Sequence, residues 1–291
     1  MFFYMPLECF LTDDMKHCVM KNGSYAWILV LLFSIFSCKE FKDGNQEVQN
    51  EDFFDFRVDS VIEEDSLTVF DSVTMRYSSK LLVFPDLHDK KILDSIYSHK
   101  KNIKDFSKTG LQKYLKDQKE DAYALVKSLQ LTPVKGQKGK WENTSQMNLR
   151  SNKNGFIHIQ YYENISENGD SDNYTYAEKV IDLKNSKKVQ LSDLTDISAG
   201  RMSEILRKNI CNTTMMQQMA KYDPRGFNLV ASSNFPVTNN FYFDEKNLYF
   251  HYNINEITTR YTIGDLIIPV PWNDLKESIN SDFQHRMKIR Y

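Results

Sequence analysis

The chain contains few of the residues that would assign it to a disulfide-rich, nucleic-acid-binding or membrane-spanning class. Its 291 residues include only four cysteines, and its formal net charge is −2. A nearly neutral chain lacks the basic surface that nucleic-acid binding requires, so we expect no nucleic-acid partner. No uninterrupted apolar run reaches the roughly 20 residues of a membrane-spanning helix. A glycine-rich nucleotide-binding loop and the Gly-x-Ser-x-Gly motif of many hydrolases are also absent from the sequence.

The histidines are too widely spaced to indicate a metal centre. The sequence has no His-x-His or His-Glu-x-x-His spacing, whereas metal ligands normally cluster. His158 and His251 fall inside predicted strands, where we interpret them as ordinary sheet side chains. Acidic residues are too numerous to single out the carboxylate pair that a glycosidase needs. The sequence therefore predicts no catalytic residue, no metal and no cofactor.

The longest apolar run, residues 26–36, is followed directly by Ser37 and Cys38. Lys21 places a positive charge before it, and this order of charge, apolar run and small residue is typical of an export signal. The stretch 35–38 resembles a lipobox, so we expect cleavage before Cys38 and a lipid on its thiol. The alternatives are an uncleaved N-terminal anchor and a plain secretory signal.

A lipidated cysteine would divide the chain into four parts. Asp13 and Asp14 suit an export signal poorly, so residues 1–19 are interpreted as an over-extended start. A lipid on Cys38 predicts a membrane partner and a place in the bacterial cell envelope, extracytoplasmic, on the outer membrane or cell surface. The four parts are a signal peptide (1–37), a lipidated N-terminus with an acidic tether (38–70), and two α+β domains (71–195 and 196–291).

The spacing of apolar residues predicts an α+β fold. Alternation predicts strands, and recurrence every three or four residues predicts amphipathic helices. Cys211 lies within a helical pattern, where we interpret it as a small buried side chain. Hairpins with interspersed helices predict an antiparallel sheet with helices packed on one face. The predicted elements are strands at 73–84 and 265–270, hairpins at 155–183 and 241–254, and helices at about 92–103, 111–129, 199–216 and after Pro271.

Short motifs, taken in order, resemble two families of domains of unknown function. The Phe84-Pro85-Asp86 step and the segment 176–194, which contains Leu191-Ser192-Asp193-Leu194, resemble family 4163. The segments 241–252 and 256–275 resemble family 3298, the RsiV-like C-terminal domain. The resemblance implies an extracytoplasmic module near the cell wall, with a protein such as lysozyme or a wall glycan as its ligand. It does not imply catalysis, because the peptidoglycan deacetylase that accompanies such domains is a separate domain.

Tyrosines beside the polar loop of the first hairpin are candidate ligand contacts. Exposed tyrosine suits protein or glycan recognition, whereas the alternative is cross-strand tyrosine pairs that only stabilise the sheet. We therefore expect a non-enzymatic lipoprotein that binds a protein, for example lysozyme, or a cell-wall glycan. The alternative is an enzyme acting on peptidoglycan or another envelope polysaccharide. The candidate ligand-binding residues are Tyr161, Tyr162, Asp170, Asp172, Asn173 and Tyr174.

Overall fold

The computed structural model describes residues 56–70, 73–128, 139–167, 174–233, 235–254, 256–257 and 264–291. The predicted signal peptide, Cys38 and the first part of the predicted tether lie outside these residues. The described residues belong to one compact unit. None of the helices within the described ranges is long and apolar enough to cross a membrane.

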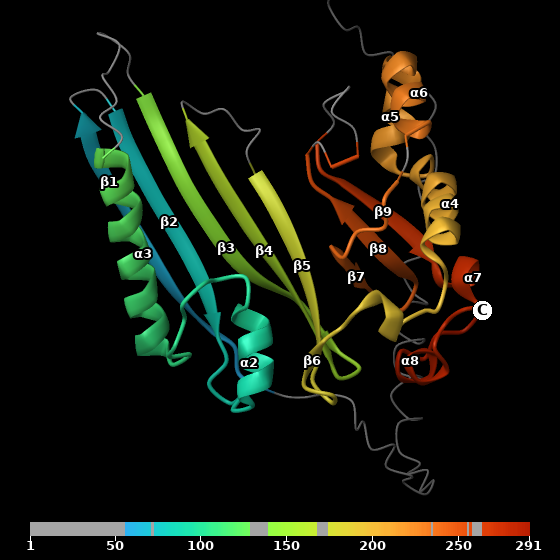
Figure 1. The fold of residues 1–291 in the computed structure, drawn as a ribbon, viewed down its shortest axis with the longest axis horizontal. Coiled ribbons are helices and arrows are strands. Elements are labelled where there is room, and N and C mark those ends of the chain that lie inside the picture. The colour runs from blue at the N-terminus through green and yellow to red at the C-terminus, as the bar shows by residue number, and fades with distance from the viewer. Residues whose placement is uncertain are drawn as a thin grey trace, which may run out of the picture. The chain divides into compact units, whose positions relative to one another are not determined.

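The larger sheet has six strands in the order β1-β2-β3-β4-β5-β6 (Figure 1). Neighbouring strands are antiparallel except β2 and β3, which are parallel. A parallel pair needs a crossover connection, and helices α2 (Lys90–Tyr97) and α3 (Lys108–Ser128) lie in it. The strands are β1 (Asp59–Phe70), β2 (Val73–Val83), β3 (Gly139–Lys153), β4 (Phe156–Glu167), β5 (Tyr174–Asp182) and β6 (Lys187–Lys188).

Helices α2 and α3 pack on one face of this sheet and enclose an apolar core. Successive side chains of a strand point to opposite faces, so Ile157, Ile159 and Tyr161 of β4 share the face that the helices cover. Ile96 of α2 and Leu111 of α3 reach the same core, and both are fully buried. Burying these side chains removes apolar surface from water and stabilises this half of the unit.

The smaller sheet is antiparallel and consists of β7 (Phe241–Phe243), β8 (Asn247–Tyr252) and β9 (Leu266–Pro271). Its apolar face packs in a second core with α4 (Ala199–Ile210), whose Met202 and Leu206 are fully buried. The remaining elements are a 3-10 turn (Leu191–Asp193) and helices α5 (Thr214–Tyr222), α6 (Pro224–Ala231), α7 (Trp272–Leu275) and α8 (Ser281–Arg286).

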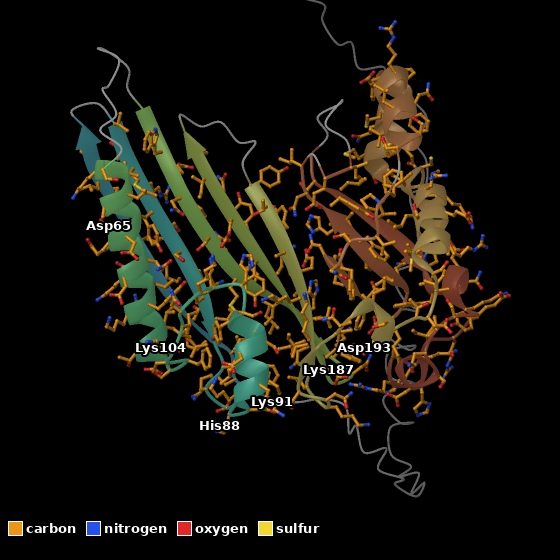
Figure 2. The ribbon with its side chains drawn as sticks, viewed as in Figure 1. Asp65, His88, Lys91, Lys104, Lys187 and Asp193 are labelled. Carbon is orange, nitrogen blue, oxygen red and sulfur yellow. The ribbon has the colours of Figure 1, made fainter. Side chains whose placement is uncertain are left out.

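Several charged side chains near α2 and β6 lie at the surface. Figure 2 shows His88 and Lys91 beside α2 and Lys104 beside the nearby end of α3, and all three side chains are exposed. Lys187 of β6 and Asp193 of the 3-10 turn form an ion pair, with their nitrogen and oxygen 2.7 Å apart. Lys91 of α2 and Lys104 thus belong to a solvated surface.

The predicted α+β class is confirmed, and three details of the prediction are wrong. Residues 59–70 form β1, which pairs with β2 along its length, instead of a tether. The sheet includes a parallel pair. Cys211 is exposed at the C-terminal cap of α4, because Thr213 caps a new helix by accepting a hydrogen bond from the Met216 amide. The strands of the larger sheet precede the predicted 195/196 boundary in the sequence, and those of the smaller sheet follow it. Both sheets belong to one compact unit.

Candidate functional site

The face of β4 and β5 that the helices do not cover carries buried polar side chains. His158 and Gln160 of β4 and Glu178 of β5 are each less than 10% exposed. This face contacts the smaller sheet, where His251 of β8 and Asp265 before β9 lie against it. The five side chains form one hydrogen-bonded chain between the two sheets.

Glu178 is the centre of this chain. Its Oε2 accepts a hydrogen bond from Nε2 of His158 at 2.6 Å. Its Oε1 accepts from Nδ1 of His251 and from Nε2 of Gln160, each at 2.8 Å. Nε2 of His251 in turn lies 3.3 Å from Oδ2 of Asp265. The side chain of Glu178 is completely buried, so these contacts replace the water that an exposed carboxylate would bind.

The hydrogen bonds determine the ionisation state of Glu178, the centre of the buried hydrogen-bonded chain. Burial by itself raises the pKa of Glu178, but the donors on His158, His251 and Gln160 outweigh it and lower the pKa to about 2. An ionised carboxylate only accepts hydrogen bonds, so the histidine nitrogens that face Glu178 carry hydrogens. His251 lies within hydrogen-bond distance of a carboxylate oxygen at both ring nitrogens, Glu178 at Nδ1 and Asp265 at Nε2.

Tyrosine rings flank both histidines. Tyr242 stacks on His158 with ring centroids 4.5 Å apart and planes 12° apart. Tyr176 stacks on His251 with ring centroids 5.0 Å apart and planes 28° apart. The Tyr174 hydroxyl donates to Oδ1 of Asp265 at 2.9 Å. These rings exclude water from the chain and strengthen its electrostatic interactions.

Two asparagines form hydrogen bonds with the backbone of β5 beside Glu178, where, within the described residues, β5 has no neighbouring strand on one side. Strand β6 pairs only with the last two residues of β5, so the preceding backbone needs other partners. Asn240 accepts from the Glu178 amide at 2.6 Å and donates to the carbonyls of Tyr176 and His251. Asn253 accepts from the Tyr176 amide at 2.6 Å and donates to the Tyr176 carbonyl. The two side-chain amides thus take the place of a neighbouring strand and fix the smaller sheet against β5.

A cavity of about 510 Å³ opens beside His158. Its polar side includes Arg150, Ser151, His158 and Gln160, and its apolar side includes Phe156 and Ile267. A cavity of this size accommodates a small ligand or one group of a larger one. The buried chain ends at the cavity wall, because both His158 and Gln160 line the cavity.

A β-bulge in β3 directs Arg150 and Ser151 into the cavity wall. The register of β3 against β4 shifts between Leu149 and Ser151, so Arg150 is the additional residue. Ser151 lies opposite His158 in the register, and directly opposite residues place their side chains on the same face. Nε of Arg150 donates to Oε1 of Gln160 at 3.1 Å, and a terminal guanidinium nitrogen donates to the same oxygen.

The structure places the predicted ligand-binding tyrosines in different surroundings. Tyr161 is buried in the helix-covered core, where its hydroxyl donates to the Ile96 carbonyl, so it offers no surface to a ligand. Tyr162 is half-buried and contacts the rings of Tyr174 and Tyr176, which matches the alternative of cross-strand tyrosine pairs. The ligand-binding prediction for Asp170, Asp172 and Asn173 lies outside the described residues, as does the lipidation of Cys38.

The sequence alone does not identify the residues of the buried hydrogen-bonded chain as functional. It predicts ordinary sheet side chains at His158 and His251, whereas both are buried and paired with Glu178. The sequence does offer a clue, because His158 and Gln160 alternate with the apolar residues Ile157, Ile159 and Tyr161, and a polar residue on a buried strand needs a partner. In the part of the chain that the structure describes, no group of three or more His, Cys, Asp or Glu side chains has the geometry of a metal site.

Solved structures show that this fold occurs elsewhere. A member of the DUF3298 family from Bacteroides fragilis has a TM-score of 0.57 to this chain at 17% identity, over 80% of this chain and 97% of that one. A DUF3298 family protein from Pseudomonas aeruginosa has a TM-score of 0.49 at 12% identity, over 79% of this chain and 96% of that one. No family model and no curated protein matches the sequence. The first of these structures shows that the fold is shared and leaves the activity open.

Proposed function

We propose that the chain is a non-enzymatic lipoprotein of the bacterial envelope that binds a cell-wall fragment in the cavity beside His158. The observation that supports this proposal is the cavity itself, where buried polar groups are held in fixed orientations before any ligand arrives. Preorganised donors and acceptors lower the cost of binding a polar ligand. A concave site of about 510 Å³ also suits a sugar or short peptide better than a flat protein surface.

Binding is tested by titrating the full chain, purified in detergent, with soluble peptidoglycan fragments in a calorimeter. Ser151→Phe fills the cavity and should weaken binding at least about tenfold, because the phenyl ring occupies the space of the ligand. Thr175→Phe is the matched control, since Thr175 is an exposed β5 residue outside the cavity lining. A flat titration of the wild-type chain, or equal binding by Ser151→Phe, would contradict the proposal.

Lysozyme is the protein ligand to compare in the same experiment. If lysozyme binds saturably and Ser151→Phe does not weaken this binding, the binding site is a protein-binding surface elsewhere on the molecule and not the cavity. If Ser151→Phe abolishes lysozyme binding, the cavity is still the binding site, but its ligand is a protein and not a wall fragment.

The proposed anchor is tested separately from the binding. Radiolabelled palmitate should enter the wild-type chain in growing cells, and Cys38→Ser should abolish the labelling, because the thiol is the acceptor of the lipid. Cys211→Ser is the matched control, since Cys211 is exposed yet far along the chain from the proposed junction. Equal labelling of Cys38→Ser would contradict the anchor.

An enzyme that removes acyl groups from peptidoglycan or another envelope polysaccharide is the second candidate function, and one observation favours it. Ser151 lies opposite His158, and His158 is hydrogen-bonded to the buried carboxylate of Glu178. These are the residue types of a nucleophile, its base and the group that orients the base. The described contacts include no hydrogen bond between Ser151 and His158, so we rank binding first. Release of acetate from purified peptidoglycan, lost in Ser151→Ala, would reverse this order.

A further inference from the structure

Arg150 is the charged group that the cavity leaves available to a ligand. We propose that the cavity takes a carboxylate group carried by the ligand, and that the guanidinium of Arg150 binds it. This inference rests on the proposed binding function and specifies the chemistry of the ligand. It follows from how Arg150 is oriented, from the pairing of the other charges, and from the apolar side of the cavity.

Buried neighbours hold the Arg150 guanidinium in place. Two of its nitrogens donate to Oε1 of Gln160, and Nε2 of Gln160 donates to Glu178 at 2.8 Å. Because Glu178 only accepts, the Gln160 amide has one allowed orientation, with its oxygen toward Arg150. Gln160 is 8% exposed and therefore moves little. A guanidinium has five N–H donors, so donors that Gln160 does not use can face the cavity.

The other charges at the cavity already have partners. Lys153 and Glu245 form an ion pair with nitrogen and oxygen 3.3 Å apart. Asp244 accepts hydrogen bonds from the backbone amides of Lys246 and Asn247 and so closes the β7–β8 turn. Within the described ranges, the only hydrogen-bond partner of the Arg150 side chain is the neutral amide of Gln160. An anion that enters the cavity therefore meets one cation that no carboxylate neutralises.

A carboxylate fits this cation better than a phosphate does. The planar guanidinium binds a planar carboxylate through two parallel hydrogen bonds. A phosphate monoester carries nearly two negative charges, and the Asp244 carboxylate at the cavity would repel these more strongly than the single charge of a carboxylate. The other side of the cavity is apolar, with Phe156, Val180 and Ile267. The arrangement suits a carboxylate on a small methyl-bearing carbon, a chemistry that both an acidic amino sugar and a peptide ending in alanine contain.

Calorimetric titration of the full chain with three probes tests this inference. The probes are N-acetylmuramic acid, which carries a lactyl carboxylate, N-acetylglucosamine, which lacks it, and acetyl-alanyl-alanine. We expect at least one carboxylate probe to bind about tenfold or more tightly than N-acetylglucosamine, because a hydrogen bond to a charged group contributes that much. The stronger of the two carboxylate probes identifies the source of the group as sugar or peptide.

Variants of Arg150 show whether the guanidinium is responsible. Arg150→Gln should weaken the carboxylate probe about tenfold or more and leave N-acetylglucosamine unchanged, whereas Arg150→Lys should retain part of the affinity. Arg76→Gln is the matched control, since Arg76 is an exposed arginine of the same sheet outside the cavity lining. Near-ultraviolet circular dichroism confirms that each variant is folded.

The outcomes separate this inference from the proposed function. Equal affinity for N-acetylmuramic acid and N-acetylglucosamine, unchanged in Arg150→Gln, would overturn the carboxylate and leave the cavity as a sugar site. If Ser151→Phe abolishes the binding of peptidoglycan fragments and Arg150→Gln has no effect on it, the carboxylate inference is likewise overturned and the cavity remains the binding site. Failure of peptidoglycan fragments and all three probes to bind would overturn both the inference and the proposed function.

Discussion

The two faces of β4 differ in kind although their residues alternate along one strand. Ile157, Ile159 and Tyr161 face helices α2 and α3, and each is almost completely buried among apolar side chains. His158 and Gln160 face the smaller sheet and form hydrogen bonds to Glu178. Apolar contact is non-directional, whereas each bond of the polar face requires one particular partner at one distance.

The comparison shows where a stable fold can accommodate a binding site. The helix-covered face stabilises the unit by removing apolar surface from water. The polar face holds charged groups in fixed positions at the cavity, and its stability depends on keeping every partner, because a buried charge without its partner is costly. Removing one methylene group should therefore have a small effect on the first face, whereas removing the central carboxylate should have a large effect on the second.

The largest effect is expected for Glu178→Ala. The change removes the acceptor for His158, His251 and Gln160 together, and we expect a loss of about 3–5 kcal/mol in the free energy of unfolding. Denaturant unfolding of the variant measures this loss. Glu120→Ala on the exposed side of α3 is the control and should change stability by less than about 0.5 kcal/mol. A loss below about 1 kcal/mol for Glu178→Ala would remove the distinction between the faces.

Acid should weaken the polar face specifically. Because the hydrogen bonds lower the folded-state pKa of Glu178 to about 2, against 4.5 for an unperturbed glutamate, its ionisation stabilises the fold above pH 4.5. That contribution is lost as the pH falls through 2. The stability difference between the wild-type chain and Glu178→Gln should therefore shrink on acidification, as denaturant unfolding at several pH values would measure. A difference that stays constant from pH 7 to 2 would argue against a buried anion.

Asn240→Ala should have an intermediate effect. The side chain donates to two carbonyls and accepts from the Glu178 amide, and its removal leaves the edge of β5 without these partners. We expect a loss of about 2 kcal/mol, measured by thermal or denaturant unfolding. Asn212→Ala, at an exposed position after α4, should leave stability nearly unchanged. Similar losses in the two variants would show that Asn240 does not join the sheets.

The smallest effect is expected on the helix-covered face, for Ile159→Val. One methylene group is removed from a fully buried side chain, so the loss should be about 1 kcal/mol. The loss should be equal at pH 7 and pH 4, since no ionisable group changes. A pH-dependent loss for Ile159→Val would show that the two faces are coupled.

The apolar face could be predicted from the sequence, and the polar face could not. Alternation in residues 155–161 and recurrence in the helices identify the core side chains, because hydrophobic periodicity is a local property. The β1 strand was missed because its acidic residues are typical of a solvated segment, yet its pairing with β2 places Val61 in the core. Formation of β1 depends on that non-local pairing.

The candidate site depends on contacts between residues far apart in the chain. Glu178 is 73 positions from His251, and Tyr174, which donates to Asp265, is 91 positions from it. Each of these residues is unremarkable in its own segment, and only the packing of the smaller sheet on β5 brings them together. The bulge that directs Arg150 into the cavity is a feature of strand register, which a single sequence does not reveal.

Nuclear magnetic resonance of neighbouring residues on the two faces is the most direct test of the central claim, that the polar face of β4 carries the binding site. Soluble peptidoglycan fragments are titrated into the full chain while the ring signals of His158 and the methyl signals of Ile159 are followed. We expect saturable shifts of the His158 signals and no change at Ile159. Unchanged His158 signals at saturating fragment, or shifts confined to Ile159, would contradict it.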